Sequence, residues 1–324
     1  MADPIRWGIL STGGIARKFA DALKHVEGAQ LVAVGSRSQA TADQFGDEYN
    51  VPRRYPNYAA LAADSDIDVV YIGSPHPMHY ADVMLCLEQG KAVLNEKPFT
   101  MTAAETIDLV RVARERKLFL MEAMWTRYLP YIVEARRLLA EGVLGRIQVL
   151  QADFGFSAPF DPTSRLYAPE LGGGALLDVG VYVVSLASLI FGQQPEQVAS
   201  FARFAPTGTD DLTGMLFRYA DNALATLTCS VSVTTQCEAF ICGEKGTLRI
   251  HPRWHGSGNA ITLTLNGQPA QTIHAPVEHN GYQYEAEEVM RCLRAGELES
   301  PVMPLDETIG IMQTLDRVQQ AWGR

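Results

Sequence analysis

The chain has 324 residues, enough for two domains that each bury a core of their own. Hydrophobic residues make up 47% and charged residues 20%, the composition of an ordinary globular protein. The formal net charge of −10 argues against a protein that binds nucleic acid or an anionic membrane surface, although a phosphate-bearing ligand needs only one local basic site.

The cysteines and the N-terminal segment indicate an ordinary cytoplasmic protein. No basic region followed by a long apolar segment opens the chain, and no apolar run approaches the length of a transmembrane helix. Scattered cysteines without a CxxC pair indicate reduced thiols. These are Cys86, Cys229, Cys237, Cys242 and Cys292. We therefore expect a cytoplasmic location and no membrane partner.

Short apolar runs alternate with helical patterns over residues 5–124. Strands are predicted over 5–10, 29–36, 69–73, 92–96 and 119–122. Helices are predicted over 15–24, 39–49, 58–63, 79–89 and 103–116. Because this alternation requires crossover connections, it predicts an α/β domain with a doubly wound parallel sheet, the Rossmann arrangement.

The pattern changes after Trp125, where extended segments follow one another with few helices between them. The extended segments are 147–156, 197–204, 211–219, 223–233, 237–242, 247–250 and 260–265. Helices are predicted over 131–141, 178–191, 277–293 and 306–322. Consecutive strands with tight turns predict an α+β domain with a large open, predominantly antiparallel sheet. We expect a dinucleotide-binding domain over 1–123 and a substrate-binding and dimerisation domain over 124–324.

The first predicted strand runs directly into Ser11-Thr12-Gly13-Gly14-Ile15-Ala16, the pattern of a dinucleotide-binding loop. Ser11 stands at the first glycine position of this fingerprint and Ala16 at the third. The central Gly13 lets backbone amides approach a pyrophosphate, and the N-terminus of the following helix favours its negative charge. We expect Ser11, Gly13, Gly14 and Ile15 to contact a bound dinucleotide.

The second predicted strand ends at Ser36-Arg37-Ser38, without the acidic residue that binds the ribose hydroxyls of NAD. Arg37 and the flanking Ser36 and Ser38 suit a 2′-phosphate, which favours NADP and leaves NAD open. The alternative for Arg37 is an exposed arginine in an ordinary strand-to-helix loop.

Glu96-Lys97-Pro98 stands at the carboxyl end of a predicted parallel strand. This position puts Lys97 in the crevice in which open α/β sheets bind ligands, whereas a lysine elsewhere is usually a solvated surface charge. Pro98 fixes the local chain direction, and we expect a cis bond before it.

A glycine run, Gly172-Gly173-Gly174, leads into an apolar helix expected to begin at Asp178 and to carry Tyr182. The run predicts a loop that passes close to a ligand, and Asp178 and Tyr182 share one helix face. Two alternatives remain open. Asp178 caps the helix, or Tyr182 is an aromatic core residue whose hydroxyl is hydrogen-bonded.

These motifs resemble those of the glucose–fructose oxidoreductase/inositol dehydrogenase (Gfo/Idh/MocA) family, which pairs a Rossmann domain with an open-sheet C-terminal domain. The resemblance rests on Glu-Lys-Pro and on Gly-Gly-Gly…Asp-x-Gly-x-(His/Tyr), and it covers essentially the whole chain. The stretch 121–128 and the segment 285–304 look most like the branch of dimeric dihydrodiol dehydrogenases and NADP-dependent D-xylose dehydrogenases.

The resemblance implies roles for particular residues. It places Lys97 and Tyr182 at the reacting carbon, with Asp178 beside them. It also places the turn after the third predicted strand beside the nicotinamide ribose. Further cofactor contacts are expected from Ser74, His76, His79 and Glu96.

The chemistry of hydride transfer supports these roles, because the hydroxyl proton must leave for a base as the hydride leaves the carbinol carbon. A free tyrosine has a pKa of about 10, and a neighbouring lysine ammonium lowers that pKa by favouring the phenolate. We expect Tyr182 to act as the general acid/base, Lys97 to tune it and orient the substrate hydroxyl, and Asp178 to hold Lys97 or the substrate.

Trp125, Arg127 and Phe156 are candidates for the substrate wall, since stacking and hydrogen bonding suit a ring that bears hydroxyls. Interdomain packing is the alternative for Trp125. No metal is expected, because His76 and His79 have no third ligand nearby in the sequence and a lysine can polarise the carbonyl.

We therefore expect an NAD(P)-dependent oxidoreductase that transfers hydride between the nicotinamide and a secondary alcohol or hemiacetal carbon of a sugar-like or trans-dihydrodiol substrate. The alternatives are another sugar or inositol dehydrogenase or reductase of the family, and a sensor that binds the cofactor without turnover. We also expect a homodimer through the C-terminal sheet, with Leu224, Leu227 and Val231 on its uncovered face.

Overall fold

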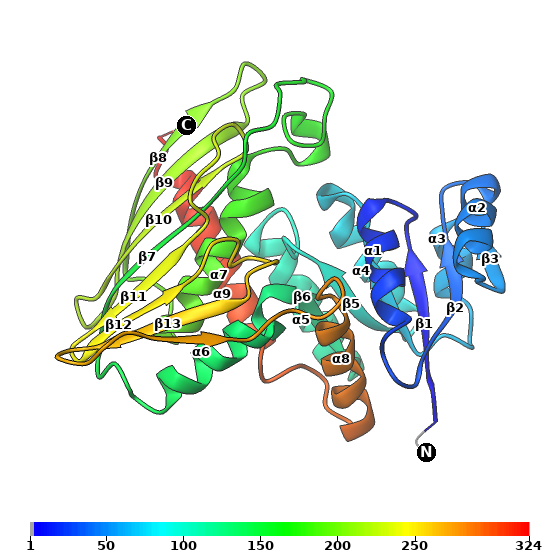
Figure 1. Ribbon diagram of the computed structural model, residues 1–324. Helices are drawn as coiled ribbons and strands as arrows, with labels where there is room; N and C mark the ends of the chain where they lie inside the picture. The colour runs from blue at the N-terminus through cyan, green and yellow to red at the C-terminus, as the bar shows by residue number, and fades with distance from the viewer. Residues whose placement is uncertain (1–2, 324) are drawn as a thin grey trace. The chain divides into compact units, whose positions relative to one another are not determined.

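The computed structural model describes residues 3–323 and divides them into two compact units, traced in Figure 1. The first unit comprises residues 3–125 and 279–309, and the second comprises residues 126–278 and 310–323. The segment 279–309 thus belongs to the first unit, whereas the sequence analysis assigned it to the second domain. This segment therefore adds a helix with a buried glutamate to the first unit.

The first unit is built on a six-stranded parallel sheet with the strand order β3-β2-β1-β4-β5-β6. Its strands are β1 (Ile5–Leu10), β2 (Ala29–Gly35), β3 (Arg53–Tyr55), β4 (Val69–Ile72), β5 (Ala92–Glu96) and β6 (Leu120–Ala123). Strands β4, β5 and β6 are buried along their whole length, as parallel strands covered on both faces must be. The predicted Rossmann sheet is confirmed, and only the short edge strand β3 was missed.

The helices of the first unit follow the predicted pattern. They are α1 (Gly14–Leu23), α2 (Gln39–Tyr49), α3 (Tyr58–Ala62), α4 (His79–Glu88), α5 (Ala103–Arg116) and α8 (Gln283–Ala295), with a 3₁₀ turn η1 (His76–Met78). The prediction that α8 starts at residue 277 was wrong by six residues, since the helix begins at 283. His279 and Gly281 have positive φ angles of 51° and 88°, which an α-helix cannot contain.

The second unit is built on an eight-stranded sheet with the strand order β14-β13-β12-β11-β7-β10-β9-β8. Its strands are β7 (Ile147–Gly155), β8 (Gln197–Phe204), β9 (Asp210–Arg218), β10 (Leu224–Ser230), β11 (Ala239–Gly243), β12 (Gly246–Ile250), β13 (Ala260–Leu265) and β14 (Gln271–His274). All neighbours are antiparallel except β7 and β10, which run parallel at the centre. The predicted open, predominantly antiparallel sheet is confirmed, although β14 was not predicted.

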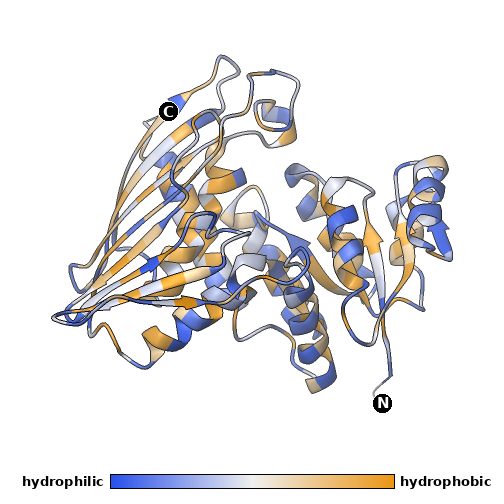
Figure 2. Ribbon diagram, in the orientation of Figure 1, coloured by the Kyte–Doolittle hydropathy of each residue, from blue (hydrophilic) through white to orange (hydrophobic). Residues whose placement is uncertain are grey.

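Helices cover one face of this sheet. They are α6 (Pro130–Ala140), the π-helical turn η4 (Leu176–Gly180), α7 (Val181–Phe191) and the C-terminal half of α9 (Leu305–Gln320), with short turns η2 (Trp125–Tyr128) and η3 (Pro169–Leu171). Within residues 3–323 no helix covers the opposite face (Figure 1), and its strands alternate between hydrophobic and hydrophilic residues (Figure 2). The placement of Leu227 and Val231 on the bare face was wrong: both are fully buried, and only Leu224 of the three is exposed. Strand side chains alternate in direction, so Leu224 and Leu227 cannot share a face.

One helical stretch, Pro169–Phe191, is long and apolar enough to cross a membrane, which the sequence analysis did not expect. In the structure 83% of the 18-residue apolar segment that defines this stretch is buried, as in the core helix of a folded domain. This stretch holds the predicted glycine run, Asp178 and Tyr182, so its apolar character reflects the core beneath the candidate site.

Candidate active site

The first strand leads into the predicted dinucleotide loop. Ser11 has a φ of 97° and its hydroxyl accepts a hydrogen bond from the Gly13 amide at 3.3 Å. Gly13 then serves as the N-cap of α1, and a Cβ at Gly14 would meet nothing within 4 Å. A left-handed residue, open space and a helix N-terminus together form a cradle that fits a pyrophosphate. The Ile15 side chain lies against Gly73, the residue after β4.

The end of β2 lies beside this loop. Ser36 is buried and its hydroxyl lies 3.3 Å from that of Thr12 and 2.6 Å from that of Thr41. Ser38 caps α2 by accepting a hydrogen bond from the Thr41 amide. Arg37 is exposed between the two serines. The serines therefore shape the loop, and Arg37 supplies its accessible positive charge.

Two buried side chains brace the turn that carries Lys97. The ring nitrogens of His79 lie 2.8 Å from the Pro98 carbonyl oxygen and 2.9 Å from that of Ser74. Asn95 donates a hydrogen bond to the Phe99 carbonyl at 2.7 Å. The expected cis bond between Lys97 and Pro98 is present. His79 is completely buried, and burial lowers its pKa, so its role is to position the turn. His76, the other histidine of the pair, is partly exposed.

Beneath Lys97 lies a buried group of acids. Glu96 accepts a hydrogen bond from the Tyr71 hydroxyl at 2.6 Å and another from the Lys97 amide at 3.3 Å. Glu285 on α8 is fully buried, and burial together with the negative charge of Glu96 raises its pKa well above the ordinary value. Burial raises the pKa of Glu96 as well, but the Tyr71 hydrogen bond and the charges of Lys97 and Lys18 oppose that rise. Burial therefore raises the pKa of both acids, and a hydrogen bond and positive charges oppose that rise only at Glu96.

In the second unit the glycine run leads into the π-helical turn η4, not directly into an α-helix. Gly172 and Gly174 have φ angles of 72° and 132°, which L side chains rarely adopt. The prediction that the helix starts at Asp178 was therefore wrong, since η4 begins at Leu176. The carboxylate that accepts a hydrogen bond from the first turn belongs to Asp210, at 2.7 Å from the Leu176 amide, and this is the role that the sequence analysis had held open for Asp178.

Asp178 and Tyr182 both belong to this helical stretch. Asp178 is nearly buried and forms an ion pair with Arg165 at 3.0 Å. Tyr182, 7% exposed, lies edge-on to Phe154 at 5.3 Å between ring centroids. Phe154 in turn stacks flat on His255 at 3.5 Å. Tyr182 thus stands in an aromatic cluster, which we call the Tyr182 cluster: Phe154, Phe156, Tyr182 and His255.

The three expected wall residues differ in their surroundings. Phe156 belongs to the Tyr182 cluster, with its ring centroid 6.4 Å from that of Phe154. Trp125 is partly exposed and stacks on Tyr282 at 4.3 Å within the first unit. Arg127, in contrast, is buried and donates to the hydroxyl and carbonyl of Ser185 on α7 at 3.0 and 3.1 Å. Arg127 therefore braces α7, and its place in the substrate wall stays a prediction.

Five residues of these surroundings were not predicted from the sequence: Phe154, Arg165, Asp210, His255 and Glu285. Glu285 was within reach, because it interrupts the apolar stripe of α8 formed by Ala286, Val289 and Met290. Nothing in the local pattern distinguishes His255 or Arg165, whose surroundings come from segments distant in the sequence. Among residues 3–323 there is also no group of three or more His, Cys, Asp or Glu side chains that could hold a metal ion.

Two family models match the two parts of the chain. The model described as "Oxidoreductase family, NAD-binding Rossmann fold" matches residues 5–124, and the one described as "GFO/IDH/MocA C-terminal domain" matches residues 132–249. The chain therefore belongs to the GFO/IDH/MocA family of oxidoreductases, with an NAD(P)-binding Rossmann domain. The family resemblance seen in the sequence is confirmed.

Relatives and solved structures resemble the chain over almost its whole length. The trans-1,2-dihydrobenzene-1,2-diol dehydrogenases of Homo sapiens and Macaca fascicularis are 39% and 38% identical to it over 330 residues, covering 98% of this chain and 97% of each relative. The 3-ketoreductase KijD10 from Actinomadura kijaniata, with NADP and TDP-benzene, has a TM-score of 0.88 at 26% identity and 98% coverage of both chains. An aldose-aldose oxidoreductase from Caulobacter crescentus, complexed with glycerol, has a TM-score of 0.91 at 23% identity, covers 99% of this chain and 98% of its own, and shares the fold.

Proposed function

We propose that this protein is an NADP-dependent dehydrogenase or reductase acting on a secondary alcohol or hemiacetal carbon of a cyclic diol or sugar-like substrate. The observation that carries the proposal is Tyr182, a hydroxyl-bearing side chain held by Phe154 and His255 on the same helical stretch as Asp178. An aromatic surface beside a potential acid/base suits a flat, apolar ring that carries hydroxyl groups. The relatives named as dihydrodiol dehydrogenases support the same substrate class.

The cofactor would be held by the first unit and would accept or donate the hydride. Ser11, Gly13 and Gly14 would surround the pyrophosphate, and Arg37 would bind a 2′-phosphate by paired, charge-assisted hydrogen bonds. The absence of an acidic residue at the end of β2 favours NADP over NAD. Ser74 and His76, which follow β4, and Glu96, the last residue of β5, complete the proposed cofactor site, with His79 holding the turn in place.

In the proposed mechanism Tyr182 takes the proton from the substrate hydroxyl during oxidation and returns it during reduction. Lys97 favours the phenolate form of Tyr182 by its positive charge and orients the substrate oxygen. Asp178, which forms an ion pair with Arg165, would hold Lys97 or a substrate hydroxyl. Trp125 and Phe156 would provide the wall for the substrate ring. We propose that residues 1–123, together with the returning segment 279–309, make up the cofactor domain, and that the rest of 124–324 makes up the substrate domain.

The test follows absorbance of the reduced nicotinamide with purified protein, NADP or NAD, and a panel of trans-dihydrodiols, aldoses and inositols. The expected result is turnover with NADP on a dihydrodiol or an aldose, lost in Lys97→Ala. Turnover confined to inositols or to keto sugars would favour another dehydrogenase or reductase of the family. Cofactor binding without turnover of any compound would favour the sensor instead.

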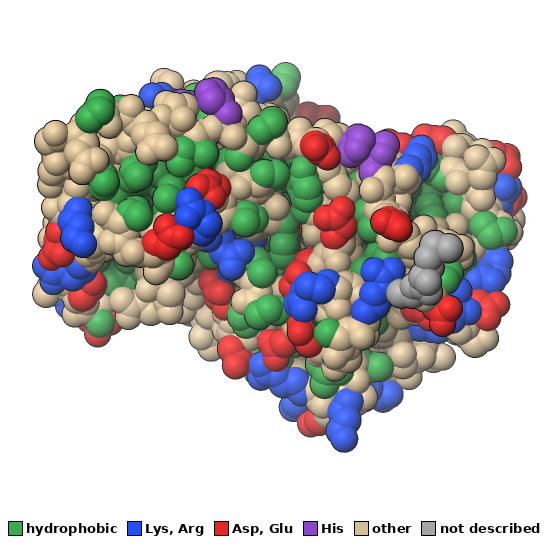
Figure 3. Space-filling model, turned by 60° about the horizontal axis from the view of Figure 1, so that its bottom comes forward, with side chains coloured by type: hydrophobic (Ala, Val, Ile, Leu, Met, Phe, Trp, Pro, Cys, Tyr) green, Lys and Arg blue, Asp and Glu red, His purple; other side chains and the backbone are tan. Residues whose placement is uncertain are grey.

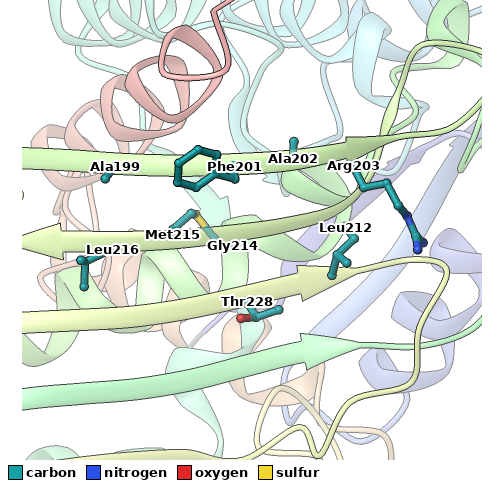
Figure 4. Close-up of a pocket in the computed structure, with 9 residues that line it drawn as sticks. All are labelled: Ala199, Phe201, Ala202, Arg203, Leu212, Gly214, Met215, Leu216 and Thr228. Atoms are coloured by element: carbon teal, nitrogen blue, oxygen red, sulfur yellow. The ribbon is translucent and has the colours of Figure 1, made fainter.

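We also propose that the bare face of the eight-stranded sheet joins two copies of this chain. Phe201 on β8 is 85% exposed and lies beside Gly214 of β9, over which a Cβ would meet nothing within 4 Å (Figure 4). In a two-fold contact each Phe201 would fill the other copy's hollow over Gly214. Phe201→Ser should then sediment as a monomer, whereas the control Leu298→Ser, at an exposed leucine of the first unit, should stay dimeric. A Phe201→Ser dimer would contradict this interface.

The remaining expectations concern compartment and other partners. The described cysteines are all free thiols, which suits a reducing cytoplasm. Acidic and basic side chains are interspersed on the face that Figure 3 presents, so that face has no basic patch for nucleic acid or anionic lipid. We propose a cytoplasmic enzyme whose partners are its cofactor, its substrate and a second copy.

A further inference from the structure

Asp210, the first residue of β9, is a buried acid that the mechanism above does not use. Its Oδ2 accepts a hydrogen bond from the Leu176 amide at 2.7 Å and another from the Thr213 hydroxyl at 3.0 Å. Leu176 is the first residue of η4, the turn that contains Asp178 and continues into α7 with Tyr182. A strand residue distant in the sequence thus supplies the acceptor that the start of this helix needs.

The glycine run is shaped around the same carboxylate. Gly174 has a φ of 132°, and a Cβ at this position would collide with Oδ1 of Asp210. Gly173 likewise has no room for a Cβ, because the backbone of Ala168 lies against it. The sequence analysis attributed these glycines to the approach of a ligand. The structure gives Gly174 a second reason, the approach of Asp210.

We propose that Asp210 is a positioning residue that fixes the first turn of the helical stretch and thereby sets the placement of Asp178 and Tyr182. The inference rests on the proposed function for its effect on turnover. The anchoring of η4 itself can be measured without any substrate.

The charge state of Asp210 should control this anchoring, because a carboxylate is a stronger acceptor than a carboxylic acid. Burial raises the pKa of Asp210 to about 6, against the opposing hydrogen bonds from Leu176 and Thr213. Two other titratable groups face it. Asp211, which is paired with Arg203, raises the pKa of Asp210 by its charge, and the buried thiol of Cys229 on β10 has a pKa raised well above the ordinary value and stays neutral.

The test compares wild type with Asp210→Asn, which keeps the shape and removes the charge. Hydrogen–deuterium exchange of peptides covering residues 172–191 should be faster in Asp210→Asn than in wild type at pH 7.5, and unchanged exchange would overturn the proposal. In kinetics, wild type should lose kcat as the pH falls through about 6. The kcat of Asp210→Asn should be about tenfold lower than that of wild type, because a charge-assisted hydrogen bond is weakened. The fall of kcat at low pH, which we call the acid limb, should be absent from this variant.

Three further readouts separate positioning from a merely structural role. The KM for NADP should not change in Asp210→Asn, because the cofactor loop belongs to the first unit. The thermal midpoint at pH 7.5 should hold or rise, since the variant removes a buried charge; a fall in midpoint together with kcat would overturn the proposal. Thr213→Val removes one of the hydrogen bonds that lower the pKa of Asp210, so the acid limb should move to higher pH.

Asp211→Asn is the matched control on the same strand. It should keep the wild-type kcat at pH 7.5 and move the acid limb slightly to lower pH, because the charge of Asp211 raises the pKa of Asp210. An acid limb that persists in Asp210→Asn would assign that limb to another group and overturn the pH-dependent part. A wild type without turnover on any substrate would contradict the proposed function, and the exchange experiment would then decide the anchoring alone.

Discussion

The two units each place an acid beneath their functional loop, but they stabilise it differently. In the first unit Glu96 and Glu285 are buried close enough for the charge of Glu96 to raise the pKa of Glu285. Glu96 accepts the hydrogen bonds and is the acid near the positive charges. In the second unit Asp210 stands with a backbone amide and a hydroxyl that both donate to it. Hydrogen bonds oppose the rise that burial causes in the pKa of Asp210, which is about 6, whereas no hydrogen bond from the described residues opposes the rise in the pKa of Glu285, which lies well above the ordinary value. Burial alone therefore does not fix the pKa of an acid; its donors contribute as well.

The units also assemble their candidate residues in different ways. Ser11, Ser36 and Lys97 follow directly after strands of one parallel sheet, and Ser74 follows β4 after one intervening residue. The carboxyl ends of these strands meet at one edge. In the second unit the Tyr182 cluster joins a helix, the strand β7 and the loop before β13. We infer that the cofactor loop of the first unit selects the cofactor and that Tyr182 of the second unit transfers the proton. Substitutions in the cofactor loop should then leave kcat unchanged, and Tyr182→Phe should leave the KM for NADP unchanged.

The largest expected effect comes from Tyr182→Phe in the second unit. Removing a general acid/base lowers kcat by roughly 10²–10⁴-fold, while the KM for NADP should not change. Stopped-flow and steady-state rates on the substrate found in the panel would measure it. Tyr219→Phe is the control, because Tyr219 is also a buried tyrosine stacked on α7, at Phe191, and its hydroxyl has no proposed role. Equal kcat in Tyr182→Phe and wild type would remove Tyr182 from the mechanism.

The different ways in which the two units bring their candidate residues together explain how much of the site could be predicted from the sequence. In the first unit an apolar strand followed by Ser11-Thr12-Gly13-Gly14 or by Glu96-Lys97-Pro98 predicts both the fold and the position of the residues, since a parallel strand and its loop form one local unit. The strand boundaries of β1 and β5 agree with the prediction to the residue. The local pattern was sufficient to place these residues in the fold, because the carboxyl ends of parallel strands meet at one edge of the sheet.

In the second unit local pattern was not sufficient. Asp178 and Tyr182 were predicted from one motif, but Phe154, Asp210 and His255 reach that helix through strand pairing and packing that no single segment encodes. Arg127 shows a second limit of the local pattern. A charged residue close to Trp125 and to a domain boundary favoured a substrate contact, but the pattern did not predict that its guanidinium is buried against Ser185. Burial of a charge depends on a partner from elsewhere in the chain, and the sequence window does not contain that partner.

Arg37→Ser tests the cofactor half of the comparison, with the next largest expected effect. Hydrogen bonds to a charged group contribute about 1.5–3 kcal/mol, so the KM for NADP should rise roughly 10- to 100-fold. The KM for NAD and the kcat with NADP should change little. Arg116→Ser, an exposed arginine at the end of α5, makes the same charge change away from the loop and should leave all of these constants alone. An equal loss of NADP and NAD affinity would show that Arg37 does not read the 2′-phosphate.

Glu285→Gln should have the smallest effect and should change stability, not turnover. The folded-state pKa of Glu285 is raised well above the ordinary value by burial and by Glu96. The native state therefore binds a proton that the unfolded chain releases, so the free energy of unfolding falls as the pH rises from about 4.3 towards the raised pKa. Glutamine mimics the protonated acid and abolishes this fall.

The gain in thermal midpoint of Glu285→Gln over wild type should accordingly be small at pH 5 and grow up to pH 8.5. Glu287→Gln, an exposed acid on the same helix, is the control and should change the midpoint little at any pH. If the gain of Glu285→Gln is the same at pH 5 and pH 8.5, Glu285 does not titrate with folding. The contrast between a pKa that burial raises without opposition in the first unit and one whose rise is opposed by hydrogen bonds in the second would then no longer hold.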